Sequence, residues 1–239
     1  MSVPAIRIRP LNAQPARPER DYVLYWMTAF RRTRWNFSLD RAVEHARELG
    51  RPLVVFEALR AGYPWASDRF HAFVVGGMRD NAARLSGSPA CYLPYVEPSP
   101  GEGRGLLEAL AARAAVVVTD DFPAFFLRRM AEAAAARLDV RLEAVDANGL
   151  LPLRATERPY PTAFSFRAFL QKHLREHLDR FPEADPLAVG TPLRPAAASL
   201  LPEGLSARWP SAPIDPSASA LARLPIDHAV EVVTSAPGG

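Results

Sequence analysis

The sequence is poor in cysteine, the residue that stabilises small extracellular folds through disulfides and many metal-bound folds as a zinc ligand. It has one cysteine, Cys91, which excludes an internal disulfide and a cysteine-based zinc site. No apolar run approaches the length that spans a bilayer. Residues 1–20 contain arginines and prolines but no apolar core of a secretory signal. We therefore expect a cytoplasmic protein that does not enter a membrane.

Lysine is almost absent as well, because Lys172 is the one lysine in 239 residues. Arginine supplies the basic balance, which gives a formal net charge of +3 and a pI of about 9.3. A basic pI is typical of nucleic-acid-binding proteins, but phosphate binding needs arginines gathered on one face. Enrichment in Arg, Ala and Pro indicates a compositional bias, so charge alone assigns no partner.

Glycine is missing from the position where nucleotide-binding loops usually have it. The turn after the first predicted strand, residues 27–36, reads MTAFRRTRWN. This excludes a GxGxxG dinucleotide loop and a P-loop at that position, because both need glycines for the backbone to approach phosphates. Gly101, Gly103 and Gly105 follow a proline-rich stretch and predict a flexible turn.

Apolar runs alternate with helical patterns between residues 21 and 181. Strands are predicted over residues 22–27, 53–56, 91–95, 115–119 and 140–145. The alternation predicts an α/β fold with a doubly wound, Rossmann-like, five-stranded parallel sheet between helical layers. Three strands are apolar throughout and belong in the centre. Strand three contains Pro94 and strand five carries Arg141 and Glu143, which suits edges, so the predicted order is 3-2-1-4-5.

Helices are predicted between the strands. We expect Asn36 or Ser38 to cap the first of them and Asp121 to cap the helix after strand four. A last helix is predicted over residues 162–181. Its predicted apolar face consists of Phe166, Phe169, Leu170, Leu174 and Leu178.

The pattern then dissolves, because residues 182–239 contain ten prolines and no long periodic segment. Such a segment predicts a linker or a wrapping extension with no independent core. We therefore expect an N-terminal arm over residues 1–20, an α/β domain over 21–181 and a proline-rich extension over 182–239.

One motif suggests metal chemistry. His173, Glu176 and His177 match the HxxEH pattern, in which two histidines hold zinc and the glutamate is a general base. A catalytic zinc needs a third ligand, and the proline-rich tail predicts no ordered helix to supply it. The histidines equally continue the apolar face of an amphipathic helix, so a zinc hydrolase is a rival hypothesis.

The second candidate site lies between strands one and four, where the winding of the predicted sheet reverses. Ligands of open α/β sheets bind there, beyond the carboxyl ends of the strands. Arg31, Arg32 and Arg34 crowd this loop, where they either bind an anion or line a solvated turn. Asp120 ends strand four at the same edge.

Residues 22–39 resemble the opening of the α/β domain of the photolyase/cryptochrome family, in its class II CPD photolyase branch. The shared residues are Tyr25-Trp26-Met27, Arg31-Arg32 and Asn36-Phe37-Ser38-Leu39. The blocks VTD at 118–120 and VDAN at 145–148 add weaker agreement. Trp35 stands where the family usually has aspartate, and Phe37 replaces its tryptophan. The resemblance covers roughly residues 6–178.

This resemblance implies a light-driven DNA repair flavoprotein, a deoxyribodipyrimidine photo-lyase. In that family a helical domain binds FAD and damaged DNA, while the α/β domain holds an antenna pigment, a deazaflavin or a folate. We expect this chain, without a helical domain, to retain no FAD and to repair no DNA alone. Its expected partners are its own missing C-terminal helical domain and, through that domain, damaged DNA. We expect a monomer.

An antenna pigment is expected over the carboxyl ends of strands one and four. The residues expected to contact it are Met27, Thr28, Arg31, Arg34, Trp35, Asn36, Glu57 and Asp120. Trp35 and Phe37 would stack on a flat ring, or else fill the core of an empty crevice. Glu57 and Asp120 would accept hydrogen bonds from ring or ribose groups. A nucleotide-binding module of the stress-protein or electron-transfer-flavoprotein type is the remaining rival.

Overall fold

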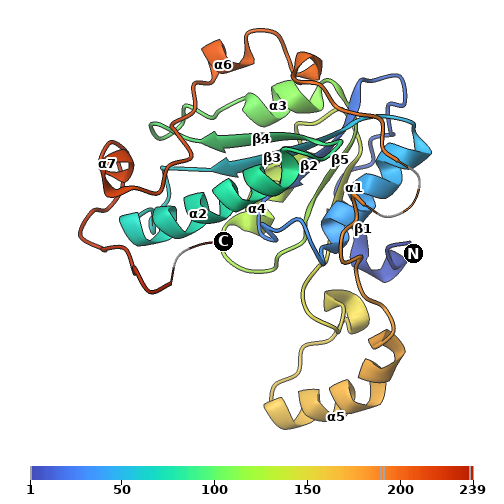
Figure 1. Cartoon of the computed structure of the whole chain (residues 1–239). Coiled ribbons are helices and arrows are strands. Elements are labelled where there is room, and N and C mark those ends of the chain that lie inside the picture. Colours follow the sequence, from blue (N-terminus) through green and yellow to red (C-terminus); the bar gives the residue numbers. More distant parts are fainter. Residues whose placement is uncertain (1, 189, 191, 237, 239) are drawn as a thin grey trace.

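Six strands form one sheet in the computed structural model, which describes residues 2–188, 190, 192–236 and 238. The strands are β1 (Ile8–Pro10), β2 (Tyr22–Met27), β3 (Leu53–Leu59), β4 (Cys91–Val96), β5 (Ala114–Asp120) and β6 (Leu142–Val145). Their order is β1-β6-β5-β2-β3-β4, and every pair is parallel except β1 with β6. The predicted α/β fold with a mostly parallel sheet is confirmed (Figure 1).

The predicted count of five strands is wrong, and the full order differs from the predicted one by the additional strand. Strands three, two, one, four and five of the prediction correspond to β4, β3, β2, β5 and β6. β1 pairs antiparallel beyond β6, with Ile8 opposite Val145 and Pro10 opposite Glu143. β6 is therefore an inner strand. A strand of three residues in a proline-rich arm has too few residues to show an alternating pattern.

The central strands owe their position to burial on both faces. Every residue of β2 and β5 is buried, as expected where helices cover a parallel sheet on both sides. β4 is only partly buried and carries Pro94, and it lies at the edge as predicted. The tail covers this edge, because Ala212 N donates a 2.8 Å hydrogen bond to Val96 O.

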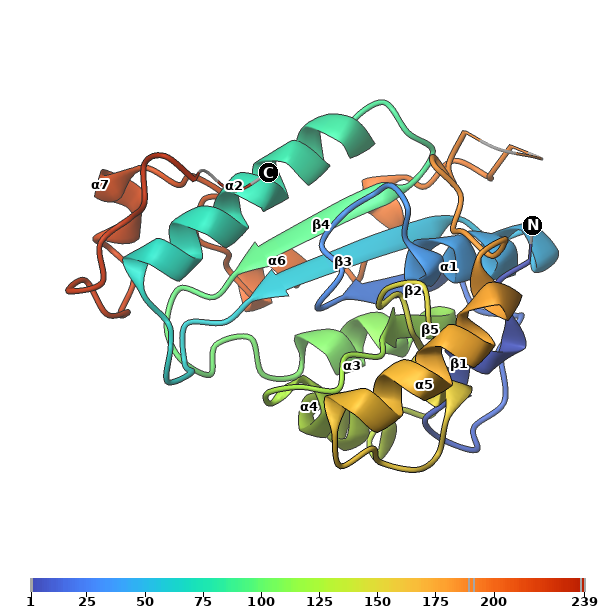
Figure 2. The ribbon, with the colours of Figure 1, turned by 90° about the horizontal axis from the view of Figure 1, so that it is seen from below.

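Helices cover the sheet on both faces. They are α1 (Phe37–Glu48), α2 (Asp68–Leu85), α3 (Leu106–Ala111), α4 (Leu127–Ala135), α6 (Leu205–Arg208) and α7 (Ala218–Leu221), with 3₁₀ turns η1 (Ala5–Arg7), η2 (Leu153–Ala155) and η4 (Ala198–Leu200). Alternate residues of β2 face opposite sides. Val23, Tyr25 and Met27 pack under α1, while Leu24 and Trp26 pack on the α3 and α4 side. α2 runs along β4 and β3 (Figure 2).

The last predicted helix is shorter than expected and leaves the layers. α5 spans Ala163–His173 and is followed by the 3₁₀ turn η3 (Leu174–His177). Neither element contains a buried residue, and Phe164 is 83% exposed. Residues 149–182 therefore form a lobe below the sheet (Figure 1) whose predicted apolar face is not buried by the rest of the chain.

The proline-rich tail returns from this lobe to the body of the domain. Leu193, Trp209 and Leu221 are buried and belong to the same apolar clusters as the sheet and its helices. Trp209 Nε1 donates a 3.0 Å hydrogen bond to Arg104 O. Among the described residues no helix is long and apolar enough to cross a membrane.

Candidate functional site at the carboxyl ends of β2 and β5

Asp120 organises the turn that follows β2. Its Oδ2 atom accepts hydrogen bonds from the backbone N–H groups of Thr28 (2.8 Å), Ala29 (2.7 Å) and Phe30 (3.0 Å). Consecutive amides of this kind are a common anion site. Here the protein's own buried carboxylate occupies it, so these amides are not open to a phosphate from outside.

Tyr25 holds the second oxygen of the same carboxylate. Its hydroxyl donates a 2.8 Å hydrogen bond to Asp120 Oδ1. Burial raises the pKa of Tyr25 well above its usual value, and the charge of Asp120 acts in the same direction. Tyr25 therefore stays a neutral donor. The expected role of Asp120 as an acceptor for ring or ribose groups is thus taken by protein donors.

Asn36 joins this turn to the start of α1. Its Oδ1 accepts from Ser38 N at 2.9 Å and Leu39 N at 3.4 Å, so the predicted cap is confirmed. Its Nδ2 donates to Tyr25 Oη and Phe30 O, both at 3.0 Å. Asn36 is fully buried and supports the loop from beneath.

Glu57 forms a second buried polar cluster at the end of β3. Arg31 Nη1 lies 3.0 Å from its Oε1, while Asn81 Nδ2 (2.9 Å) and Tyr92 Oη (2.7 Å) donate to its Oε2. Arg31 also donates to Ala58 O at 2.7 Å. Glu57 is fully buried, so its carboxylate likewise has protein partners where ligand groups were expected.

Neither Asn81 nor Tyr92 was predicted to take part in this cluster. Asn81 lies on the buried face of α2, together with Val74, Met78 and Leu85. A buried amide in an apolar stripe needs hydrogen-bond partners, which was the available signal. Asn81 Nδ2 also approaches Met27 Sδ at 3.8 Å, and Met27 is fully buried. Burial raises the pKa of Tyr92, and the charge of Glu57 adds to this rise.

Trp35 and Arg34 are the exposed members of the predicted set. Trp35 is 53% exposed and has a φ of 50°, which is strained for a bulky residue. Its N–H donates to Glu183 O at 3.1 Å, and its carbonyl accepts two hydrogen bonds from Arg32. Thr28 is half-buried at the same loop. Trp35, Arg34 and Thr28 are therefore the accessible members of the predicted set.

Phe37 does not join them. It is buried in the core beneath α1, and the guanidinium of Arg7 lies 4.5 Å from its ring centroid. The expected stacking of Phe37 on a flat ligand therefore has no structural basis, while Trp35 remains accessible.

Asp121 does not cap a helix. α4 begins at Leu127 without a side-chain cap, because the segment after β5 first runs on as a loop. Asp121 instead pairs with Arg9 at 3.1 Å and Arg154 at 2.8 Å. Burial opposes its ionisation, but the hydrogen bonds and charges of the two arginines outweigh that effect and lower the pKa of Asp121. It ties the N-terminal arm to the lobe.

The HxxEH pattern does not form a zinc site. α5 ends at His173, so Glu176 and His177 lie in the following 3₁₀ turn and the two histidines are not spaced on one α-helix. His173 Nδ1 lies 3.7 Å from Glu176 Oε1. Within the described part of the chain, no group of three or more His, Cys, Asp or Glu residues is placed to hold a metal ion.

Comparisons with known proteins agree with this fold. No protein-family model matches the chain. It is 31% identical over 175 residues to a deoxyribodipyrimidine photo-lyase of Methanothermobacter thermautotrophicus, an alignment that covers 73% of this chain and 38% of that protein. A cryptochrome of Synechocystis sp. PCC6803 has a similar fold, with a TM-score of 0.51 and 13% identity over 77% of this chain and 41% of the cryptochrome.

The chain thus spans less than half the length of either protein that it matches. The identity extends over most of the chain, and the sheet with its helices has a fold similar to that of part of the cryptochrome. The predicted family is confirmed. The chain belongs to the photolyase/cryptochrome family and corresponds to its N-terminal α/β domain.

Proposed function

We propose that this chain is the scaffold and antenna domain of a photolyase-like, light-driven DNA repair flavoprotein. One observation carries the proposal beyond sequence identity. The two blocks of the resemblance, residues 25–39 and 118–120, meet in a single buried network around Asp120. This network shapes the loop at the point where doubly wound sheets bind ligands.

The pigment, a deazaflavin or a folate, lies over the carboxyl ends of β2 and β5. Thr28, Arg34 and Trp35 contact it, because these residues of the predicted set are at least partly exposed. Trp35 stacks on the ring and Arg34 pairs with an acidic group. The other five predicted residues act beneath the ligand by holding the loop in place: Met27, Arg31, Asn36, Glu57 and Asp120.

FAD and damaged DNA belong to a helical domain that packs against this one. The lobe of residues 149–182 offers an apolar surface for that contact, because Phe164 is 83% exposed and Phe181 is 51% exposed. The protein works in the cytoplasm as a monomer, and its single free cysteine suits a reducing compartment.

Fluorescence titration of the purified chain with a deazaflavin and a folate tests the antenna role. We expect one pigment to bind, and Arg34→Ala/Trp35→Ala to weaken it about tenfold or more, in line with the loss of one stacked ring and one ion pair. Phe164→Ala is the matched control and leaves pigment binding unchanged. If the wild-type chain binds neither pigment, the antenna role is wrong.

The scaffold role is tested on the same protein with FAD and with a dimer-containing oligonucleotide under blue light. We expect no stoichiometric FAD and no dimer splitting, because both belong to the helical domain in this proposal. Retention of FAD at one per chain, or light-dependent repair by this chain, would contradict it.

A further inference from the structure

The positive charge of the chain is concentrated in the lobe of residues 149–182. The lobe contains six of the 29 basic residues and three of the 26 acidic ones, which leaves 23 of each sign for the rest of the chain. The lobe therefore accounts for the whole formal net charge of +3. A polyanion binds where cations gather on one face, so the arrangement of these cations decides whether the lobe can bind one.

The aromatic rings of α5 lie on one side of the helix. Tyr160, in the loop before α5, packs against Phe166 and Phe169, with ring centroids 5.6 and 5.2 Å apart. The rings of Phe169 and His173 follow, with centroids 4.5 Å apart. Residues three and four apart share a face of a helix, so these rings mark the inner side of α5. Figure 2 shows α5 in front of the rest of the chain in the view from below.

The other side of α5 is an exposed strip with cations along both borders. Spacings of four and three residues place three residues on this strip: Phe164, Ala168 and Gln171. Arg167 borders the strip on one side and Lys172 on the other. Arg175 continues it in η3, one 3₁₀ turn beyond Lys172. All of these residues are exposed. We call the strip and its three cations the α5 basic face.

No acidic side chain neutralises this face. α5 contains no aspartate or glutamate, and Glu176, which follows in η3, lies 3.7 Å from His173 on the ring side. Among the residues that the structure describes, the side chains of Arg167, Lys172 and Arg175 have no hydrogen-bond or ion-pair partner. Like charges that are held on one face without partners are complementary to a polyanion.

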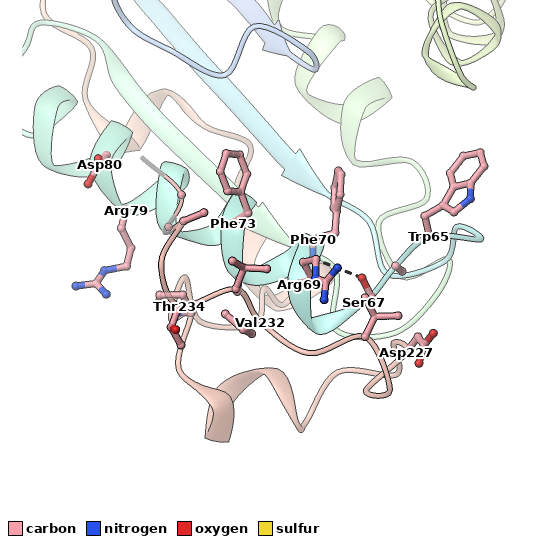
Figure 3. Close-up of a pocket in the computed structure, with 18 of the residues that line it drawn as sticks. Trp65, Ser67, Arg69, Phe70, Phe73, Arg79, Asp80, Asp227, Val232 and Thr234 are labelled. Atoms are coloured by element: carbon pink, nitrogen blue, oxygen red, sulfur yellow. Dashed lines mark hydrogen bonds between the residues drawn. The ribbon is translucent and has the colours of Figure 1, made fainter.

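Arginines elsewhere on the surface have partners of their own. A cavity of about 1010 Å³ between α2 and the end of the tail is lined by Arg69 and Arg79 (Figure 3). Arg69 Nε donates a 2.9 Å hydrogen bond to Glu231 O. Hydrogen bonds from Ser217 lower the pKa of Asp215, and the charge of Arg79 acts in the same direction. The arginines of this cavity are therefore engaged with the tail, unlike the cations of α5.

The α5 basic face suits the backbone of a duplex better than the bases of a single strand. Single-strand sites stack bases on rows of aromatic rings, whereas the row of rings on α5 lies on the inner side. Arg167 and Lys172 are about 7.5 Å apart along the helix axis, which corresponds to about two phosphates of one DNA strand. Gln171 lies between them and can donate its amide to a phosphate oxygen.

We propose that the α5 basic face binds the phosphate backbone of double-stranded DNA, whatever its sequence and whether or not it is damaged. Arg167 and Lys172 pair with phosphates on the two borders of the strip, and Arg175 pairs with a third. The choice of DNA among polyanions rests on the proposed function, whereas the binding itself needs no pigment, FAD or lesion. The face is separate from the pigment site over β2 and β5.

Fluorescence anisotropy of a labelled DNA duplex of about 20 base pairs, titrated with the chain at several salt concentrations, tests this proposal. We expect the logarithm of the association constant to fall with the logarithm of the salt concentration, with a slope of about −3 for three neutralised phosphates. Arg167→Ala/Lys172→Ala should reduce the slope to about −1 and weaken binding about tenfold or more at about 50 mM salt. Duplexes with and without a pyrimidine dimer should bind equally, because only the backbone is contacted.

Two controls separate this face from net charge and from apolar contact. Arg104→Ala/Arg208→Ala removes the same charge beside α3 and α6, at the opposite end of the molecule from α5 (Figure 1), and should leave affinity within about twofold of wild type. Phe164→Ala removes the most exposed ring of the lobe without a change of charge and should leave the salt slope unchanged. Urea unfolding of each variant checks that the domain stays folded.

Four outcomes overturn the proposal. The wild-type chain fails to bind the duplex at low salt. Arg167→Ala/Lys172→Ala keeps the wild-type slope, which places the DNA elsewhere. The two double variants lose affinity equally, which assigns the binding to net charge alone. Vesicles that contain phosphatidylserine bind the chain while the duplex does not, and Phe164→Ala weakens that binding, which makes α5 a membrane-surface helix.

Discussion

Tyr25 and Asp120 face each other across two adjacent parallel strands, and the tyrosine hydroxyl donates a 2.8 Å hydrogen bond to the aspartate carboxylate. Both side chains are buried beneath the loop. The pair fixes the carboxylate so that its other oxygen gathers the amides of the loop after β2. The shape of the candidate pigment site therefore depends on a group beneath it.

Replacement of Asp120 by alanine should lower the free energy of unfolding of the domain. The change leaves three backbone N–H groups and the Tyr25 hydroxyl without their acceptor, at roughly 1–3 kcal/mol for each buried donor that water cannot reach. We expect a loss of about 3–5 kcal/mol in the free energy of unfolding, measured by urea denaturation. Asp179→Asn, an exposed change in the lobe, is the control and should stay within about 0.5 kcal/mol of wild type.

Replacement of Arg31 should destabilise the domain, because it leaves the buried carboxylate of Glu57 without a cationic partner. Arg31→Leu removes its cationic partner and should lose about 3–5 kcal/mol, whereas Arg31→Leu/Glu57→Leu removes both charges and should lose less. A double-mutant cycle by urea denaturation measures the coupling. If the loss in the double variant equals the sum of the losses in Arg31→Leu and Glu57→Leu, the two side chains do not interact.

Asp40 should make the domain less stable as pH rises from about 4 to about 7. Burial raises the pKa of Asp40 to about 7, although the Glu183 N–H at 3.0 Å from Oδ2 acts the other way. The folded chain thus holds a proton that the unfolded chain has released above about pH 4. Stability contributed by this proton is complete below pH 4 and is lost as pH rises toward 7, by at most about 1.4 kcal/mol per pH unit.

Asp40→Asn should remove this slope. The variant should gain on wild type as pH rises from 4 to 8, and urea midpoints at several pH values measure the difference between the two proteins. A difference that is independent of pH would show that Asp40 is ionised in the folded chain throughout.

Trp35 should tolerate glycine better than alanine. Its φ of 50° is strained for any residue with a Cβ, and the penalty is about 1 kcal/mol. Because the ring is largely exposed, its loss is common to both variants. We expect Trp35→Gly to be about 1 kcal/mol more stable than Trp35→Ala by thermal or urea unfolding. The reverse order would show that the loop relaxes when the ring is removed.

Several features of the fold were predictable from local sequence. β2 is apolar along its whole length and β5 is apolar from Ala114 to Val118, so strands buried on both faces, and hence a parallel sheet, followed from their composition. Asn36 was predictable as a cap, because an asparagine just before an amphipathic helical pattern commonly accepts hydrogen bonds from the first backbone N–H groups of the helix. Pro94 marked β4 as an edge strand for the equally local reason that proline cannot donate to a ladder.

Tertiary structure alone decided the rest. β1 forms only because β6 offers it an open edge, and three residues carry no pattern of their own. The partners of Asp120 lie about ninety residues away in the chain, and those of Glu57 lie on a strand, a helix and a loop. Sequence placed both carboxylates at the right edge of the sheet, since the ends of parallel strands meet there. A buried carboxylate must accept hydrogen bonds from its neighbours. Tertiary packing brought protein donors next to both carboxylates, so each one faces the protein's own groups and not a ligand.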